Sequence, residues 1–275
     1  AVKGSQGPRN MGIKYEETVY AHHRALWKQG IATDVIGSED SFDGYKLIIA
    51  PMLYMCREET GRKLEQFVEQ GGTLVTTYWS GVVDEHDLCH LGGFPGPLRK
   101  TLGIWAEEIE GLYDYDRNGL KLSAGNALGL SGTYEAHEIC ELIHTEGAEV
   151  LGVYTDDFYA GRPALTLNRL GQGRAYYMAA RLKDEFLSDF YTAAAAEAGV
   201  SRALQTELPQ GVSAAVRTDG TTDYMFLMNF SGEPRQVELD ERSYSDMETG
   251  DSVSGPVELP VNGVKLLKRR SAFSK

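Results

Sequence analysis

The sequence has few cysteines, a deficit of basic residues and no long hydrophobic run, and each shortage excludes a class of protein. Three cysteines in 275 residues, Cys56, Cys89 and Cys140, are odd in number and far apart. They form no disulfide framework and are typical of a reducing cytoplasm. The chain has only 27 Lys and Arg but 40 Asp and Glu, and the resulting net charge of −13 argues against nucleic acid as a partner. No apolar run reaches the roughly 18 residues that a membrane span requires.

A structural element is also missing at the start of the chain. Lys14–Ile36 has the pattern of a helix followed by a buried strand, which is the second half of an α/β unit. Residues 1–13 are polar and Gly-rich, so the strand that should precede this helix is not there. A parallel sheet without its first strand exposes backbone donors and acceptors. We therefore expect the chain to be the C-terminal part of a longer polypeptide.

What is present is ordinary for a globular protein: 42% hydrophobic and 24% charged residues, in a chain long enough for two domains. Up to residue 103, helical and strand patterns alternate. The expected helices are Glu16–Lys28 and Thr60–Gln70, and the expected strands are Thr33–Ile36, Lys46–Ala50 and Thr73–Thr77. This rhythm predicts a doubly wound parallel sheet.

Beyond Gly103 the pattern changes to strands separated by glycine-rich turns, with one further helix. The expected strands are Glu107–Tyr113, Lys121–Ser123, Ile139–His144, Val150–Tyr154, Ala164–Asn168 and Ala175–Ala179, and the helix is Leu182–Ala198. Gly171–Gly173 is expected to be a hairpin loop.

A domain boundary is expected near Thr206–Gly211, which gives domains at 1–205 and 206–275. The second domain contains only short alternating strands separated by turns such as Asp219-Gly220 and Asn262-Gly263. This pattern predicts a small antiparallel sandwich or partial barrel.

Two short motifs suggest chemistry, and for both we favour a structural interpretation. Ser80 follows the strand Thr73–Thr77 where a nucleophile elbow would place its serine, but Tyr78 occupies the position that needs glycine, and no histidine can be assigned by spacing. Asp84–His90 packs several metal-ligand types into seven residues but lacks a second pair of ligands at a matching distance. Carboxylate pairs such as Asp156-Asp157 arise by chance among 40 acidic residues, so we assign no catalytic residue and no metal.

The loop Leu91–Ile104 is the strongest candidate for a functional surface. Glycines and prolines fix an irregular backbone around Phe94, and Arg99 follows. Such loops commonly present residues to a partner. We predict an interface that contains Phe94 and Arg99, with Trp79 and Trp105 adding aromatic area.

Four segments together resemble the β-galactosidases of glycoside hydrolase family 42. They are YEETVYAHHRALWKQGIATDVI from residue 15, YKLIIAPMLYM from residue 45, LEQFVEQGGTLVTTYWSG from residue 64 and GGFPGPLRKTLGI from residue 92. The resemblance weakens over residues 105–200 and returns faintly at FLMNFSGEP, from residue 226.

The resemblance implies a middle trimerisation domain with a flavodoxin-like fold, similar to class I glutamine amidotransferases, and a C-terminal β domain. It also implies that a (β/α)8 barrel with both catalytic glutamates lies outside this sequence, so this segment alone is inactive and needs no cofactor. The longer enzyme would be a cytoplasmic homotrimer that hydrolyses terminal β-D-galactose residues. Two alternatives stay open: a free-standing amidotransferase-like scaffold module, and a hydrolase that uses Ser80.

Overall fold

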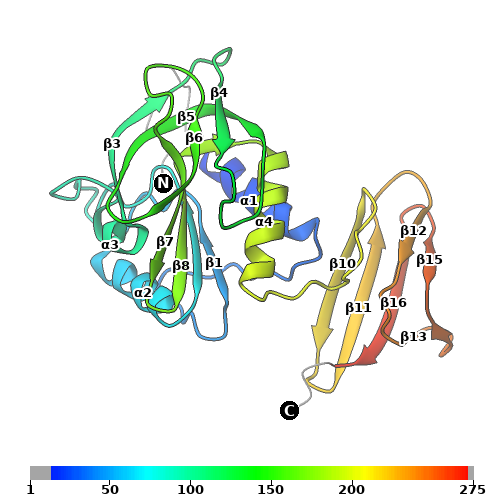
Figure 1. Ribbon diagram of the computed structural model, residues 1–275. Coiled ribbons are helices and arrows are strands. Elements are labelled where there is room, and N and C mark those ends of the chain that lie inside the picture. The colour runs from blue at the N-terminus through cyan, green and yellow to red at the C-terminus, as the bar shows by residue number, and fades with distance from the viewer. Residues whose placement is uncertain (1–13, 272–275) are drawn as a thin grey trace. The chain divides into compact units, whose positions relative to one another are not determined.

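The computed structural model describes residues 14–271 (Figure 1). It divides into two compact units. One contains the chain up to residue 22 and residues 36–199, and the other contains residues 23–35 and the chain from residue 200. No helix in the described range is long and apolar enough to cross a membrane.

The first unit is built on a nine-stranded sheet. Its strands are β1 (Leu47–Ala50), β2 (Thr73–Thr77), β3 (Ile104–Gly111), β4 (Asn118–Leu122), β5 (Thr133–Thr145), β6 (Glu149–Tyr154), β7 (Pro163–Leu170), β8 (Gly173–Met178) and β9 (Ala180–Leu182). The strand order is β1-β2-β8-β7-β6-β4-β5-β3, and β9 pairs with β5. The helical segments are α1 (Tyr15–Trp27), which continues into the second unit, α2 (Glu58–Glu69), η1 (Gly96–Leu98), α3 (Arg99–Leu102) and α4 (Asp184–Glu197).

The sheet is mixed, whereas the sequence predicted a doubly wound parallel sheet. Only β1, β2 and β8 run parallel, and every other pairing is antiparallel. The reason is visible at residues 171–172, a two-residue connection between β7 and β8. A connection this short can only join antiparallel neighbours. The predicted hairpin loop is therefore confirmed, and it is also what limits the parallel part of the sheet.

The local patterns explain the central elements. All five residues of β2 are buried, as expected for a parallel strand covered on both faces. In α2 the buried positions include Leu64 and Val68, four residues apart on one helical face. The prediction that the last helix starts at Leu182 was wrong, because residues 180–182 form β9 and α4 begins at Asp184.

The predicted strand Thr33–Ile36 is also wrong. These residues form no strand, and Val35 and Ile36 are 89% and 37% exposed. A strand exists only when a neighbour completes its hydrogen-bond ladder. β1 is an edge strand that pairs only with β2, and no described segment is hydrogen-bonded to its other side. The polar segment 1–13 lies outside the described residues.

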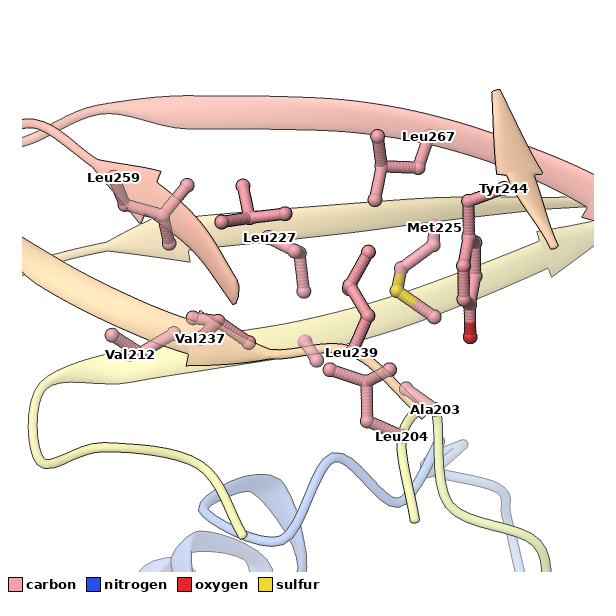
Figure 2. Packing of buried hydrophobic residues seen from close by; sticks show 12 residues of the cluster. Ala203, Leu204, Val212, Met225, Leu227, Val237, Leu239, Tyr244, Leu259 and Leu267 are labelled. Atoms are coloured by element: carbon pink, nitrogen blue, oxygen red, sulfur yellow. The ribbon is translucent and has the colours of Figure 1, made fainter. Parts of the chain in front are cut away.

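The second unit is antiparallel throughout, as the sequence predicted. Its strands are β10 (Val212–Thr218), β11 (Thr222–Asn229), β12 (Arg235–Glu238), β13 (Tyr244–Asp246), β14 (Ser252–Val253), β15 (Pro256–Leu259) and β16 (Val264–Arg270). They form a five-stranded sheet ordered β10-β11-β16-β13-β14 and a two-stranded sheet of β12 and β15. Figure 2 shows Met225 and Leu227 of β11 in one apolar cluster with Val237, Leu239 and Leu259. Burial alternates strictly along β11, so one face of this strand supplies the core.

A buried ion pair adjoins that apolar cluster. Arg269 Nε donates to Asp223 Oδ2 at 3.1 Å, and both side chains are 6% exposed. The same guanidinium donates through NH1 to the Tyr244 hydroxyl at 2.8 Å and to the Ala203 carbonyl at 3.3 Å. The buried charge is thus paired and hydrogen-bonded, which a charge in an apolar interior requires.

Candidate functional site

A tight turn at residues 78–81 follows the carboxyl end of β2. Trp79 and Gly81 adopt φ values of 59° and 60°. Glycine is required at residue 81, because a Cβ there would lie 2.0 Å from the Pro95 carbonyl oxygen. Trp79 is the strained residue, since a bulky side chain with positive φ is rare outside constrained turns. The turn is therefore elbow-like, with tryptophan at the strained position.

Ser80 is a structural part of this turn. Its side chain is buried, donates to the Thr77 carbonyl at 2.7 Å and lies 2.8 Å from the Thr76 hydroxyl. It also accepts the Leu53 backbone N–H at 3.0 Å. A serine nucleophile needs a general base within hydrogen-bond reach. Within the described chain, the Ser80 hydroxyl is hydrogen-bonded to a threonine and to backbone groups, none of which is a general base. These bonds fasten the turn to the strand before it.

The residue that anchors the turn, Glu141, was missed by the sequence analysis. It lies on β5, is fully buried, and accepts the Trp79 backbone N–H at 2.7 Å through Oε1. The Tyr177 hydroxyl of β8 donates to Oε2. The available signal was a single acidic residue inside the apolar run Ile139–Ile143. Such a residue requires internal partners if the run is a core strand.

The surroundings of Glu141 perturb its ionisation. Burial raises the pKa of this carboxyl to about 7, although the hydrogen bonds from Tyr177 and Trp79 act in the opposite direction. The pKa of Tyr177 is raised well above its usual value, first by burial and then by the adjacent carboxyl. A raised carboxyl pKa can mark a general acid, but only where a substrate can approach the group. Glu141 is sealed in the core, so its geometry supports anchoring of the elbow.

The polar loop 84–90 is held by its own backbone. Asp84 Oδ1 accepts the N–H groups of His86 at 2.9 Å and Leu88 at 3.0 Å, and these bonds lower the pKa of Asp84. His90 Nε2 lies 3.0 Å from the Cys56 carbonyl oxygen. Within residues 14–271, no three His, Cys, Asp or Glu side chains are placed to bind one metal ion. The polar groups of this loop therefore organise a turn.

Three of the four predicted interface residues lie around β3 and the loop before it. Trp105 is the cross-strand partner of His144, and their rings stack at 4.4 Å between centroids with 7° between planes. Phe94 forms a backbone bridge to Ala106, the residue after Trp105. Arg99 makes a two-pronged contact with Glu146, at 2.6 Å and 2.5 Å. Phe94, Arg99 and Trp105 are all half-buried.

The fourth residue, Trp79, lies on the elbow next to the same loop. Its ring stacks on Tyr54 at 5.5 Å between centroids, and it packs with Ile109 of β3 against a small buried cluster. The close approach of Gly81 to Pro95 joins the elbow to the residue that follows Phe94. Trp79, Phe94, Arg99 and Trp105 thus all lie in the part of the chain from the end of β2 to the start of β3, and contacts connect the elbow, the loop and β3.

Comparisons with known proteins agree with this organisation. The family model for the β-galactosidase trimerisation domain matches residues 1–201, and the model for the β-galactosidase C-terminal domain matches residues 211–269. β-Galactosidase BglY of Alicyclobacillus acidocaldarius is 54% identical over 269 residues, which are 98% of this chain and 39% of that protein.

Solved structures give the same result. The cold-adapted β-galactosidase of Rahnella sp. R3 matches with a TM-score of 0.91 and 50% identity, over 97% of this chain and 38% of that one. The β-galactosidase of Bacillus circulans sp. alkalophilus matches with a TM-score of 0.92 and 40% identity, over 98% of this chain and 39% of that one. The chain therefore spans about two-fifths of the length of these relatives. It belongs to the β-galactosidases of glycoside hydrolase family 42, of which it comprises the trimerisation and C-terminal domains.

Proposed function

We propose that the chain is the non-catalytic, subunit-joining part of a cytoplasmic β-galactosidase that hydrolyses terminal non-reducing β-D-galactose residues. The observation that carries this proposal is the pair of consecutive family matches, 1–201 and 211–269, which together fill the chain. The similar enzymes contain a further three-fifths of their length that these matches do not cover. Catalysis is assigned to that further part.

The buried acid of this chain is unsuited to glycoside hydrolysis. A retaining glycosidase uses two carboxyl groups about 5 Å apart on either side of the bond that is cleaved. Glu141 has a raised pKa, but Trp79 and Tyr177 occupy its two oxygens inside the core. We assign both catalytic glutamates to a preceding (β/α)8 barrel, and we assign no cofactor to this segment.

We further propose that domain 1–205 is a flavodoxin-like, amidotransferase-like fold whose first strand belongs to the preceding part of the enzyme. That strand would pair with the side of β1 (Leu47–Ala50) to which no strand within residues 14–271 is paired, and β1 is half-exposed. It would also offer a partner to Thr33–Ile36, the β-branched run that forms no strand by itself. Domain 206–275 is the C-terminal antiparallel domain.

A direct activity measurement tests the assignment of catalysis. The purified 275-residue chain, prepared from a host without β-galactosidase, should not hydrolyse o-nitrophenyl β-galactoside. The polypeptide extended to include the preceding part should hydrolyse it. Turnover by the short chain, or an extended polypeptide with no galactosidase activity, would disprove the assignment.

The trimer is proposed to form through the surface that contains Trp79, Phe94, Arg99 and Trp105. Sedimentation should give about 91 kDa, three times the chain mass of 30.3 kDa. Trp105→Ala should weaken assembly by about 30-fold, because large aromatic residues dominate interface energies. Phe158→Ala is the matched control, since this 72% exposed aromatic lies outside the proposed surface. Equal loss in both variants, or a persistent monomer before mutation, would argue against this surface.

A further inference from the structure

A pocket of about 340 Å³ lies between the loop that precedes β1 and the helix α2. The loop contributes Phe42, Asp43 and Tyr45, and the helix contributes Gln66 and Phe67, with Gln70 directly after it. This volume is at the lower end of the range for small-molecule sites, about 300–1,000 Å³. The pocket takes no part in the elbow or the proposed interface.

The loop that forms one wall is fixed to the helix that forms the other. Lys63 Nζ donates to the carbonyl oxygens of Ser38 at 3.1 Å and Asp40 at 2.7 Å. The same ammonium lies 4.5 Å from the centre of the Phe42 ring, which packs edge-on against Phe67 at 6.2 Å. A preformed pocket binds with a smaller ordering cost than one that must assemble around its ligand.

The charged groups of the pocket are already engaged. Lys63 is committed to two carbonyl oxygens, and an acidic residue lies in the same lining, so an anion gains little. Asp43 Oδ2 accepts the Ser41 hydroxyl at 2.7 Å and is the only carboxyl of the described lining, so a cation also lacks ligands. The charges therefore favour a neutral ligand.

The remaining polar groups of the lining are the hydroxyls of Ser41 and Tyr45 and two side-chain amides. Gln66 and Gln70 are four residues apart and share one face, and each amide offers two donors and one acceptor. Both glutamines are exposed, and neither side-chain amide is hydrogen-bonded within the described chain, so both can reach a ligand from the solvent side. Three aromatic side chains, Phe42, Tyr45 and Phe67, lie in the same lining.

We propose that this pocket binds a neutral, polyhydroxylated molecule of monosaccharide size. Ring hydroxyls both donate and accept, as the two amides do, and the C–H face of a sugar ring packs on aromatic surface. The galactosidase assignment rests on the two family matches and not on this pocket, so neither proposal depends on the other.

Titration of the ¹⁵N-labelled chain with galactose tests the proposal, with glucose, glycerol and inorganic phosphate as comparison probes. We expect saturable shifts with a sugar, confined to residues 41–45 and 66–72, at a Kd of about 1–10 mM. The double variant Gln66→Ala/Gln70→Ala removes two exposed side chains, so it should fold normally and bind about tenfold more weakly.

Gln236→Ala, at an exposed glutamine of β12, is the matched control and should bind like the unmodified chain. Saturable binding that the double variant leaves unchanged would overturn the proposal. So would shifts produced by phosphate alone, by glycerol as strongly as by sugar, or by none of the probes. An inactive extended enzyme with intact sugar binding here would count against the galactosidase assignment only.

Discussion

The two units bury a carboxyl group in opposite ways. In the first unit, Glu141 is held by neutral donors, the Trp79 backbone and the Tyr177 hydroxyl. In the second unit, Asp223 is held by the guanidinium of Arg269. Burial raises the pKa of Glu141 to about 7. Burial also opposes ionisation of Asp223, but hydrogen bonds from Arg269 and other side chains outweigh it and lower the pKa of that carboxyl.

The difference determines how each unit responds to pH. A carboxyl whose pKa is raised by folding binds its proton more tightly in the folded state, so its unit loses stability as pH rises toward that pKa. A carboxyl whose pKa is lowered contributes stability that is lost as pH falls. We therefore expect a rise in pH from 4.5 to about 7 to weaken the first unit, and a fall in pH below 3.8 to weaken the second.

The largest expected effect comes from breaking the ion pair of the second unit. Arg269→Met should lower the free energy of unfolding of this unit by about 3–5 kcal/mol at neutral pH, because Asp223 is left buried without a counter-charge. Hydrogen exchange of β11 and β16 amides measures this loss locally, without assuming that both units unfold together.

A second substitution shows whether the charge is responsible. Arg269→Met combined with Asp223→Asn removes both charges and should recover part of the loss, since no isolated ion then remains in the core. A double variant as unstable as Arg269→Met would mean that the hydrogen bonds to Tyr244 and Ala203, and not the charge of Asp223, dominate.

The next largest effect is expected at Glu141, the buried carboxyl that has no positively charged partner among its hydrogen bonds. A folded-state pKa of about 7 against 4.5 in the unfolded chain corresponds to about 3 kcal/mol. This stability is fully present below pH 4.5 and is lost as pH rises to about 7. Glu141→Gln should abolish this part of the slope, because glutamine keeps polar contacts without ionising. Hydrogen exchange of β5 and β8 amides at pH 5 and pH 8 measures it.

Glu149→Gln provides the matched control on β6, the next strand along the chain. Glu149 is exposed at the start of β6, so its replacement should leave the pH slope of the first unit unchanged. If Glu141→Gln retains the full slope, the carboxyl of Glu141 is not the group that links folding of this unit to pH.

The same contrast shows what the sequence could predict. Helices α1 and α2 and strands β1 and β2 were located to within a few residues, because their apolar spacing reflects local geometry. The alternation of β11 likewise predicted an antiparallel second unit. Interactions between distant residues could not be read this way. Glu141 meets Trp79 across 62 positions, and Arg269 meets Asp223 across 46.

The prediction of a strand at Thr33–Ile36 was wrong for a related reason. Thr33–Ile36 has a β-branched composition, but pairing depends on a neighbour that composition does not reveal. The candidate surface was partly accessible from the sequence, since glycine and proline around Phe94 indicate a constrained loop. The stacking of Trp105 on His144 could not be predicted from the sequence, because it depends on the register between β3 and β5.

The smallest expected effect concerns the elbow at residues 78–81. Ser80 holds this turn in place with an uncharged hydroxyl, whereas Glu141 holds it with a carboxyl group. Ser80→Ala should cost about 1–2 kcal/mol, because the Leu53 N–H and the Thr77 carbonyl each lose a partner. Ser131→Ala, at an exposed serine, should change stability by less than about 0.5 kcal/mol. Galactosidase activity of the extended enzyme should be the same in both variants. A hydrolytic activity of the chain that Ser80→Ala abolishes without changing stability would make this serine a nucleophile, and the hydrogen bonds that now fasten the turn would have to rearrange to release it.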